Sequence, residues 1–394
     1  MSWSDTSWFT LVIVRIAIVA ESFPPDVNGV AHCTLRIVEH LVDRGHEPLV
    51  IAPAPARGAP GAAGPFPCPV TRLRSMPVPV YRNFRISTPG PALGAAVAGH
   101  RAELVHLASP FVLGSGRQPL PTIALYQTDM PGYARVYRTG PLGEAAAWHW
   151  VRRIHNAADR TLAASTASAD SLRAHGVERV WVWGRGVDTR LFDPAKRNER
   201  LRRELAPGGE VLIGYVGRLA PEKRVDLLAQ VAEVPGARLV IVGGGPAEAA
   251  LRRAMPGAVF LGPRYGPELA QVYASLDIFV HSGARETFGQ TLQEAAASGL
   301  PVVAPAAGGP LDLVSDGVTG FLVPPEAPGP LAAAVSRLVR DPAMRAAMGQ
   351  AGLKKVTGHT WPVLCDELIG HYEAILGSTG TAERQHDDDF RGTR

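Results

Sequence analysis

The sequence predicts an α/β protein built on two doubly wound parallel sheets. Residues 12–42 and residues 211–234 each begin with an apolar strand, pass through a loop that contains glycine, and continue as a helical pattern. Both strands are apolar almost throughout, which is typical of parallel strands buried on both faces. The length of 394 residues fits two domains at roughly 150 residues each. We therefore expect two Rossmann-like domains.

The remaining elements continue this alternation along the chain. In the first half, strands are expected near residues 48–52, 104–107, 122–126, 160–164 and 180–183, and a helix near 143–158. In the second half, strands are expected near residues 238–242, 258–261, 278–281, 301–304 and 320–323, and helices near 268–275, 291–298 and 330–340. Such sheets bind ligands at the carboxyl ends of their strands. Two of them facing a central cleft would form a site with residues from both halves.

The domain limits follow from a change in composition. Residues 188–209 carry many charges together with Pro and Gly, as linkers do. We predict an N-terminal domain at 10–187, a C-terminal domain at 210–358, a final helix at 359–377 that packs back across the domains, and a disordered tail at 378–394.

Composition excludes several classes of protein. Hydrophobic residues make up 46% of the chain, which is too many for a disordered, solvated chain. The net charge is only +4, and no run of five Lys or Arg occurs, so nucleic acid is not an expected partner. Cys33, Cys68 and Cys365 are odd in number and far apart, which fits a reducing cytoplasm rather than a disulfide framework or a zinc site. Residues 1–20 lack the basic start of a signal peptide.

The segment Gly217-Arg218-Leu219-Ala220-Pro221-Glu222-Lys223 ends a predicted strand and precedes a predicted helix. A helix N-terminus attracts phosphate, and Arg218 and Lys223 add positive side chains. Lys223 is one of only four lysines in the chain, against 36 arginines. The other interpretation is an ordinary loop in which Arg218 pairs with Glu222, and the segment alone does not decide between the two.

The segment Glu286-Thr287-Phe288-Gly289-Gln290, followed by Glu294, comes after another strand. Glu286 can accept hydrogen bonds from sugar hydroxyls, and Glu294 can accept a pair from a ribose diol. Backbone N–H groups at 287–290 can hold phosphate oxygens. A helix start with favourable acidic residues, or a pair of hydrolytic carboxylates, would also fit the spacing.

Two weaker signals lie in the first half. Gly29, within Asn28-Gly29-Val30, can let the backbone approach a phosphate closely, although a plain turn also explains it. Gln127 and Asp129 follow the strand at 122–126 and can point into the cleft, although an Asp in this place is as often a cap or turn residue. Neither G-x-G-x-x-G nor a P-loop motif occurs, which argues against dehydrogenases and P-loop enzymes.

Taken together, the motifs are far more specific than any one alone. GRLAPEK, VGGGP, SGARETFGQTLQEAAASGLPVVA and AGGPLDLVSDGVTGFLV resemble the donor half of the family 4 retaining glycosyltransferases. The first-half segments RIAIVAESFPPDVNGVAHCTLRIVEHL, VHLASPFVLG, ALYQTDMPGYA and VWGRGVDTRLFDP match as well. The pattern is most similar to actinobacterial mannosyltransferases that use GDP-mannose. The resemblance implies the GT-B fold over roughly residues 14–377.

The resemblance also assigns roles to single residues. It implies that Arg218 and Lys223 contact the donor diphosphate and steady the leaving group, and that Glu286 contacts the donor sugar. Glu294 would hold the ribose. The turn Phe288, Gly289 and Gln290 would face the sugar and phosphate, and Gly29 would lie near the diphosphate. No cofactor or metal is implied.

One departure from the family pattern is Gln127, which stands where many relatives carry a histidine that reaches the donor sugar. Gln127 can hydrogen-bond a sugar hydroxyl but cannot act as a general base. A sugar-nucleotide binding protein without activity therefore stays an alternative, beside a nucleotide-sugar epimerase and a transferase that uses UDP-sugars.

The acceptor is expected to be a lipid-linked hydroxyl, such as that of a phosphatidylinositol mannoside, or a polyol or oligosaccharide. Residues 72–85 combine four arginines with Tyr81 and Phe84, and residues 143–158 carry Trp148, Trp150, Arg152 and Arg153. Either segment can meet an anionic headgroup, or be an ordinary loop and helix. We expect a cytoplasmic protein with peripheral contact to the inner face of the plasma membrane.

Overall fold

A computed structural model describes residues 13–56, 65–78, 85–132 and 140–391, with side chains described up to residue 377. The chain forms two compact units. Unit 1 comprises Met1–Ala124, Ala157–Asp159 and His371–Arg394, and unit 2 comprises Leu125–Asn156 and Arg160–Gly370. These units divide the chain at other positions than the expected linker at 188–209, and the domain limits inferred from the sequence stay predictions.

A seven-stranded sheet is formed by the first half of the chain. Its order is β3-β2-β1-β6-β7-β8-β9. The strands are β1 Arg15–Ala20, β2 Glu47–Pro53, β3 Val70–Leu73, β6 Leu104–Ala108, β7 Thr122–Tyr126, β8 Arg160–Ala163 and β9 Val180–Val182. Strand β1 pairs in parallel with both β2 and β6, and the strand order reverses between β1 and β6. Residues 16–20 of β1 are all buried, which explains their continuous apolar run.

The helices of the first half fall between these strands. They are α1 Gly29–Asp43, α2 Pro91–Gly99, α4 Gly140–Ala157, α5 Thr166–Ala174 and the 3-10 helix η1 Leu113–Ser115. A short antiparallel pair is formed by β4 Met76–Pro77 and β5 Arg85–Ile86. Asn28 caps α1, because its side-chain oxygen accepts hydrogen bonds from the backbone of Val30 and Ala31.

A six-stranded parallel sheet forms the core of the second half. Its order is β12-β11-β10-β13-β14-β15. The strands are β10 Val211–Val216, β11 Ala237–Val242, β12 Val259–Gly262, β13 Ile278–Val280, β14 Val302–Pro305 and β15 Gly320–Val323. The helices are η2 Pro194–Lys196, α6 Glu199–Leu205, η3 Pro221–Lys223, η4 Val225–Leu228, α7 Ala229–Ala232, α8 Glu248–Ala254, α9 Gly266–Ser275, α10 Gln290–Ala297, α11 Pro310–Leu313, α12 Pro328–Arg340 and α13 Pro342–Val356.

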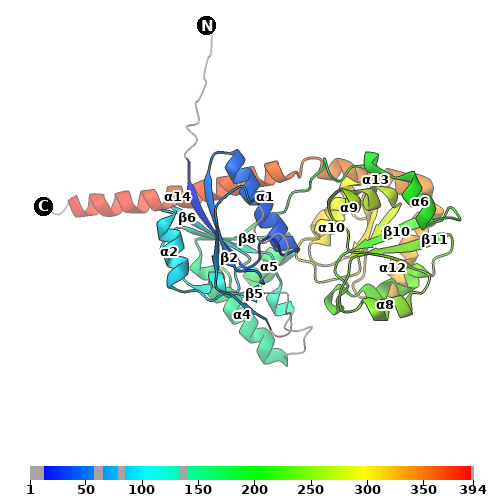
Figure 1. Ribbon diagram of the computed structural model, residues 1–394, viewed down its shortest axis with the longest axis horizontal. Helices are drawn as coiled ribbons and strands as arrows, with labels where there is room; N and C mark the ends of the chain where they lie inside the picture. Colours follow the sequence, from blue (N-terminus) through cyan, green and yellow to red (C-terminus); the bar gives the residue numbers. More distant parts are fainter. Residues whose placement is uncertain (1–12, 57–64, 79–84, 133–139, 392–394) are drawn as a thin grey trace, which may run out of the picture. The chain divides into compact units, whose positions relative to one another are not determined.

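Helices cover both faces of this sheet. Along β10, Leu212 and Val216 pack into one core cluster, while Ile213 and Tyr215 pack into the other. This alternation follows from the two-residue period of a strand. Figure 1 shows α8 and α12 on one side of β10 and β11, and α9 and α10 on the other. The prediction of an α/β protein with two parallel sheets is therefore confirmed.

The final helix is longer than the sequence led us to expect. Helix α14 spans Trp361–Arg391 instead of ending at residue 377. Residues 378–391 contain no proline and include Ala, Glu, Arg and Gln, which favour helix, so the acidic run at 387–389 does not interrupt it. Across the part of the chain that the structure describes, no helix combines the length and apolarity needed to cross a membrane.

Candidate active site

The loop at 217–223 begins where β10 ends. Gly217 donates its N–H to the carbonyl of Val242, and Leu219 donates to that of Gly244, so the loop lies against the turn that follows β11. A Cβ at Gly243, whose φ is 131°, would overlap the carbonyl oxygen of Gly217. The close approach of these two turns therefore requires glycine.

No continuous helix begins after this loop, contrary to the sequence-based expectation. The 3-10 helix η3 ends at Lys223, and Arg224 has the left-handed φ of 47°. The chain then continues as η4 and α7, which are four residues each. With no extended helix to provide a dipole, the positive charge of the loop comes from its side chains.

Lys223 is held against Glu286. Its Nζ donates a hydrogen bond of 2.6 Å to Glu286 Oε2, and both side chains are mostly buried. Burial alone would raise the pKa of this carboxyl, but positive neighbours, Lys223 foremost, lower the pKa of Glu286 to about 2. The Glu286 carboxyl is thus ionised at neutral pH.

His281 lies beside the same carboxylate and stays neutral. Its Nε2 is 3.7 Å from Glu286 Oε2, and its side chain is 3% exposed. Burial lowers the pKa of His281 to about 4, although Glu286 opposes this shift. Neither ring nitrogen has a hydrogen-bond partner among the described residues.

Arg218 pairs with Glu222. The Arg218 guanidinium donates to Glu222 Oε1, and the arginine side chain is 42% exposed whereas that of the glutamate is buried. The ion pair that the sequence left open is therefore present. It leaves the Arg218 guanidinium near the surface of the loop, where an anion can reach it.

The loop at 286–290 rests on two glycines that precede α11. Gly309 donates its N–H to the carbonyl of Glu286, and a Cβ at Gly309 would overlap the carbonyl oxygen of Phe288. Gly289, with a φ of 101°, starts α10 without a side-chain cap. Among the described residues, the first N–H groups of α10 therefore have no side-chain acceptor, which is the arrangement that binds phosphate oxygens in other proteins.

The side chains of Phe288 and Gln290 pack against the protein instead of extending into solvent. Phe288 is 4% exposed, and Gln290 donates from its side chain to the carbonyl of Gly186 at 3.1 Å. Both side chains thus fix the loop in place. The buried Oε1 of Gln290 has no partner among the described residues, whereas Phe288 and Gly289 can contact the sugar nucleotide through their backbone groups.

Glu294 lies within α10 and is buried against Tyr273. The tyrosine hydroxyl donates to Glu294 Oε2 at 3.1 Å. Burial raises the pKa of Glu294 to about 8, although the hydrogen bond from Tyr273 opposes this shift. At neutral pH this carboxyl is therefore mostly protonated.

Gln127 is brought to the 286–290 loop. The hydroxyl of Thr287 donates to the backbone carbonyl of Gln127 at 2.9 Å. The side-chain oxygen of Gln127 accepts a hydrogen bond of 2.7 Å from Arg185 Nη2, and both side chains are buried. Because arginine only donates, the Gln127 amide must turn its oxygen to Arg185, and its Nε2 is left without a partner in the described chain.

Asp129 stabilises the turn in which it lies. Its Oδ1 accepts hydrogen bonds from the backbone N–H of Gly132 at 3.0 Å and from the hydroxyl of Tyr126 at 3.3 Å. This is the cap-like role that we expected as the alternative to a cleft contact. Gly29 is the first residue of α1 and belongs to unit 1, so its expected place near the diphosphate stays a prediction.

In both segments expected at a membrane, several of the basic or aromatic side chains contact the protein itself. Arg72 donates to the carbonyl of Pro24, and Arg85 donates to that of Ser75, so both bind their own chain. Tyr81 and Phe84 lie outside the described residues. On α4, Trp148 stacks on His175 with ring centroids 3.6 Å apart.

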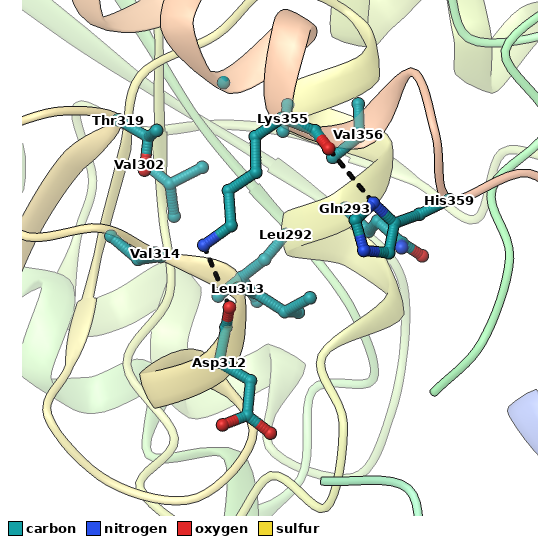
Figure 2. Close-up of a pocket in the computed structure, with 12 residues that line it drawn as sticks. Leu292, Gln293, Val302, Asp312, Leu313, Val314, Thr319, Lys355, Val356 and His359 are labelled. Atoms are coloured by element: carbon teal, nitrogen blue, oxygen red, sulfur yellow. Dashed lines mark hydrogen bonds between the residues drawn. The ribbon is translucent and has the colours of Figure 1, made fainter. Parts of the chain in front are cut away.

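A separate cavity of about 40 Å³ lies between α10, α11 and α13. Figure 2 shows Lys355 reaching from α13 toward Asp312, whose carbonyl accepts its hydrogen bond at 2.9 Å, and His359, whose Nδ1 is 3.0 Å from the carbonyl of Lys355. The volume suits about three waters and is far below that of pockets for drug-sized ligands. None of the expected site residues lines it.

Sequence reasoning missed three residues of this site: Arg185, Tyr273 and His281. Arg185 and Tyr273 are placed by contacts with residues farther away in the sequence, Gln127 and Glu294, whereas His281 lies beside Glu286, five positions away. His281 ends a strand that was expected, and Arg185 stands in the segment VWGRGVD that helped to carry the resemblance. No group of three or more His, Cys, Asp or Glu able to hold a metal occurs within the described ranges.

Comparisons with known proteins agree along most of the chain. A family model described as "Glycosyltransferase Family 4" matches residues 27–191, and one described as "Glycosyl transferases group 1" matches residues 196–355. The chain is 49% identical to a "GDP-mannose-dependent alpha-mannosyltransferase" of Mycobacterium tuberculosis, over 93% of this chain and 98% of that protein. It is 42% identical to a protein with the same name from Corynebacterium glutamicum, over 92% of this chain and 89% of that protein.

A solved structure shows the same fold at low sequence identity. The sucrose-phosphate synthase of Thermosynechococcus elongatus superposes with a TM-score of 0.77 at 21% identity, over 93% of this chain and 100% of that chain. At this identity the likeness concerns the fold alone.

Proposed function

This chain belongs to the family 4 glycosyltransferases, and on that basis we propose that it transfers an α-mannosyl group from GDP-mannose to an acceptor hydroxyl. The observation that carries the choice of donor is the 49% identity, over 93% of the chain, to a relative named for GDP-mannose. The geometry supports the same chemistry. Arg218 and Lys223 provide two cations in one loop, and the uncapped start of α10 adds N–H donors.

The proposed reaction places developing negative charge on the departing diphosphate. Preorganised cations and N–H donors stabilise such charge without having to reorganise during the reaction. Arg218 and Lys223 would act on the diphosphate. Glu286, kept ionised by Lys223, would accept hydrogen bonds from the sugar. Glu294 would accept hydrogen bonds from the ribose. These roles follow from the family resemblance together with the contacts described above.

We further propose that the transfer retains the anomeric configuration and needs no metal. The acceptor is proposed to be a lipid-linked sugar, such as a phosphatidylinositol mannoside, or a polyol or oligosaccharide. The protein would act in the cytoplasm, in peripheral contact with the inner face of the plasma membrane. What supports this contact is helix α4, where Leu142 is 86% exposed and Arg152 and Arg153 lie on the surface.

A donor panel tests the proposed function. Purified protein is incubated with a membrane extract and GDP-mannose, UDP-glucose or ADP-glucose, with EDTA present and absent, and released nucleotide and sugar products are measured. We expect GDP release and a new α-mannoside, equal with and without EDTA. Release of UDP alone would favour the UDP-sugar transferase. A free epimer would favour the epimerase, and binding without turnover would favour the silent binding protein.

A further inference from the structure

Arg185 is a buried cation next to the candidate site. It is 7% exposed and lies between β9 and η2. Its Cζ is 5.8 Å from the centroid of the Phe288 ring, and it is one of the positive groups that lower the pKa of Glu286. The guanidinium therefore lies beside the 286–290 loop, near the Lys223–Glu286 pair.

No carboxylate of the described residues forms an ion pair with Arg185. Its Nη2 donates to the neutral amide of Gln127, and its Nε is enclosed without a partner. A buried charge without a counter-charge is costly, because desolvation is not offset by an opposite charge. Arginine keeps its proton in proteins, so it cannot relieve this cost by becoming neutral.

The other charged groups of the site differ in this respect. Arg218 is paired with Glu222, and Lys223 is paired with Glu286. His281 and Glu294 are mostly neutral at pH 7 because of their shifted pKa values. Arg185 thus differs from Arg218 and Lys223 in having no carboxylate partner among the described residues.

We propose that Arg185 is a further donor-binding residue, whose guanidinium pairs with an anionic oxygen of the donor diphosphate. Gln127 holds the guanidinium in this position through its side-chain oxygen, and Phe288 packs against it. An incoming diphosphate supplies the counter-charge that the buried guanidinium lacks. The inference rests on the proposed function, because it takes a nucleoside diphosphate sugar as the ligand.

Calorimetric titration with GDP and with guanosine tests the inference. The two ligands differ only in the diphosphate, so the ratio of their affinities isolates the anion contact. We expect R185Q and R185M to weaken GDP binding about 10- to 100-fold, as for loss of a charged hydrogen bond, and to leave guanosine binding unchanged. The remaining GDP affinity should also depend less on salt. R190Q makes the same change at an exposed arginine five residues away, and it should leave the affinity for both ligands unchanged.

Three results would overturn the inference. One is an unchanged GDP-to-guanosine ratio in R185Q and R185M. Another is an equal loss of affinity for GDP and for guanosine in a folded variant, which would mean that Arg185 has a structural role only. The third is GDP binding by R185Q and R185M that keeps the salt dependence of the wild type, since Arg185 would then make no ionic contact with the diphosphate. If the wild type binds UDP rather than GDP, the ratio is measured with UDP and uridine. A wild type that binds neither diphosphate refutes the proposed function itself.

Discussion

At the scale of single residues, the site is organised by burial acting on charge. Lys223 and Glu286 share a mostly buried ion pair, so both stay charged. Glu294 is buried more deeply than Glu286 and accepts a hydrogen bond from the hydroxyl of Tyr273, with no cation paired to it among the described residues. Burial therefore raises its pKa to about 8. Two glutamates eight positions apart in sequence thus hold opposite protonation states at neutral pH, because only one of them has a cation beside it.

This difference predicts that donor affinity depends on pH through Glu294. Ribose hydroxyls donate hydrogen bonds to a carboxylate, so binding favours the ionised form and should release a proton. We expect GDP affinity to rise with pH up to about 8, approaching about tenfold per pH unit at its steepest. Calorimetric titration between pH 6 and 9 measures this slope. Glu294→Gln should bind more weakly with a flat profile, and an equal slope in both proteins would contradict the role of Glu294.

The same shift gives a stability effect whose sign is fixed. The folded-state pKa of Glu294 lies above its ordinary value of 4.5. The contribution of this group is therefore fully present below pH 4.5 and is lost as pH rises through about 8. In chemical denaturation, the difference in free energy of unfolding between wild type and Glu294→Gln should decline across this window. A difference that grows with pH would show that Glu294 is ionised in the folded protein.

The sequence identified several residues of the site, but it did not show which of them contact one another. Arg218, Lys223 and Glu286 stand in recognisable segments, and their residue types suit phosphate and sugar. That Lys223 reaches Glu286, 63 positions away, depends on β10 and β13 lying side by side in the sheet. Arg185 stands in one of the segments that carry the resemblance, but its residue type alone did not mark it as a site residue, because the absence of a counter-charge is visible only in the structure.

At the scale of elements, the sheet positions the site through the turns at the ends of its strands. The turns after β10 and β11 approach each other through Gly217 and Gly243, and the 286–290 loop lies against Gly308 and Gly309. The apolar strands could be predicted because burial on both faces leaves a continuous apolar run. The absence of the helix expected after Gly217 could not be predicted. Most residues of this segment are compatible with a helix, and the left-handed backbone of Arg224 that interrupts it leaves no mark in the sequence.

Gly309 offers a direct test of the loop. Its φ of −57° suits any residue, so Gly309→Ala changes only the contact with the carbonyl of Phe288. We expect the free energy of unfolding to fall by about 1–3 kcal/mol, as for overpacked sites, and transfer to fall further because the loop moves. Thermal denaturation and initial rates measure the two effects. Gly257→Ala, with nothing within 4 Å of the added carbon, is the matched control. Equal behaviour of both variants would mean that the loop does not depend on this contact.

At the scale of the whole molecule, two parallel sheets of seven and six strands underlie the fold, and the alternation of strands and helices predicted both. The length of α14 was not predicted, because charged residues favour a solvated helix as much as a disordered tail. Composition gave little guidance to partners. The net charge of +4 is small, and the proposed donor contacts involve local charges, those of the 217–223 loop and of Arg185.

The proposed membrane contact can be tested by reversing surface charges. Arg152 and Arg153 on α4 are both exposed, as are Arg252 and Arg253 on α8, where two adjacent arginines again follow an apolar residue. We expect R152E/R153E to lower binding to vesicles with anionic phospholipid about tenfold or more, at about 1 kcal/mol for each basic residue lost. Vesicle sedimentation measures the bound fraction. R252E/R253E should bind as the wild type does, and an equal loss in both variants would contradict a role for α4.

The most direct test of the account is mannosyl transfer from GDP-mannose labelled in the sugar to a membrane extract, with Lys223→Ala beside the wild type. We expect labelled α-mannoside from the wild type and a loss of about 100- to 1,000-fold in the variant, as when one donor to a developing anion is removed. Lys354→Ala, at an exposed lysine, should be unaffected. Full transfer by a folded Lys223→Ala protein, or no labelled product from the wild type, would contradict the account.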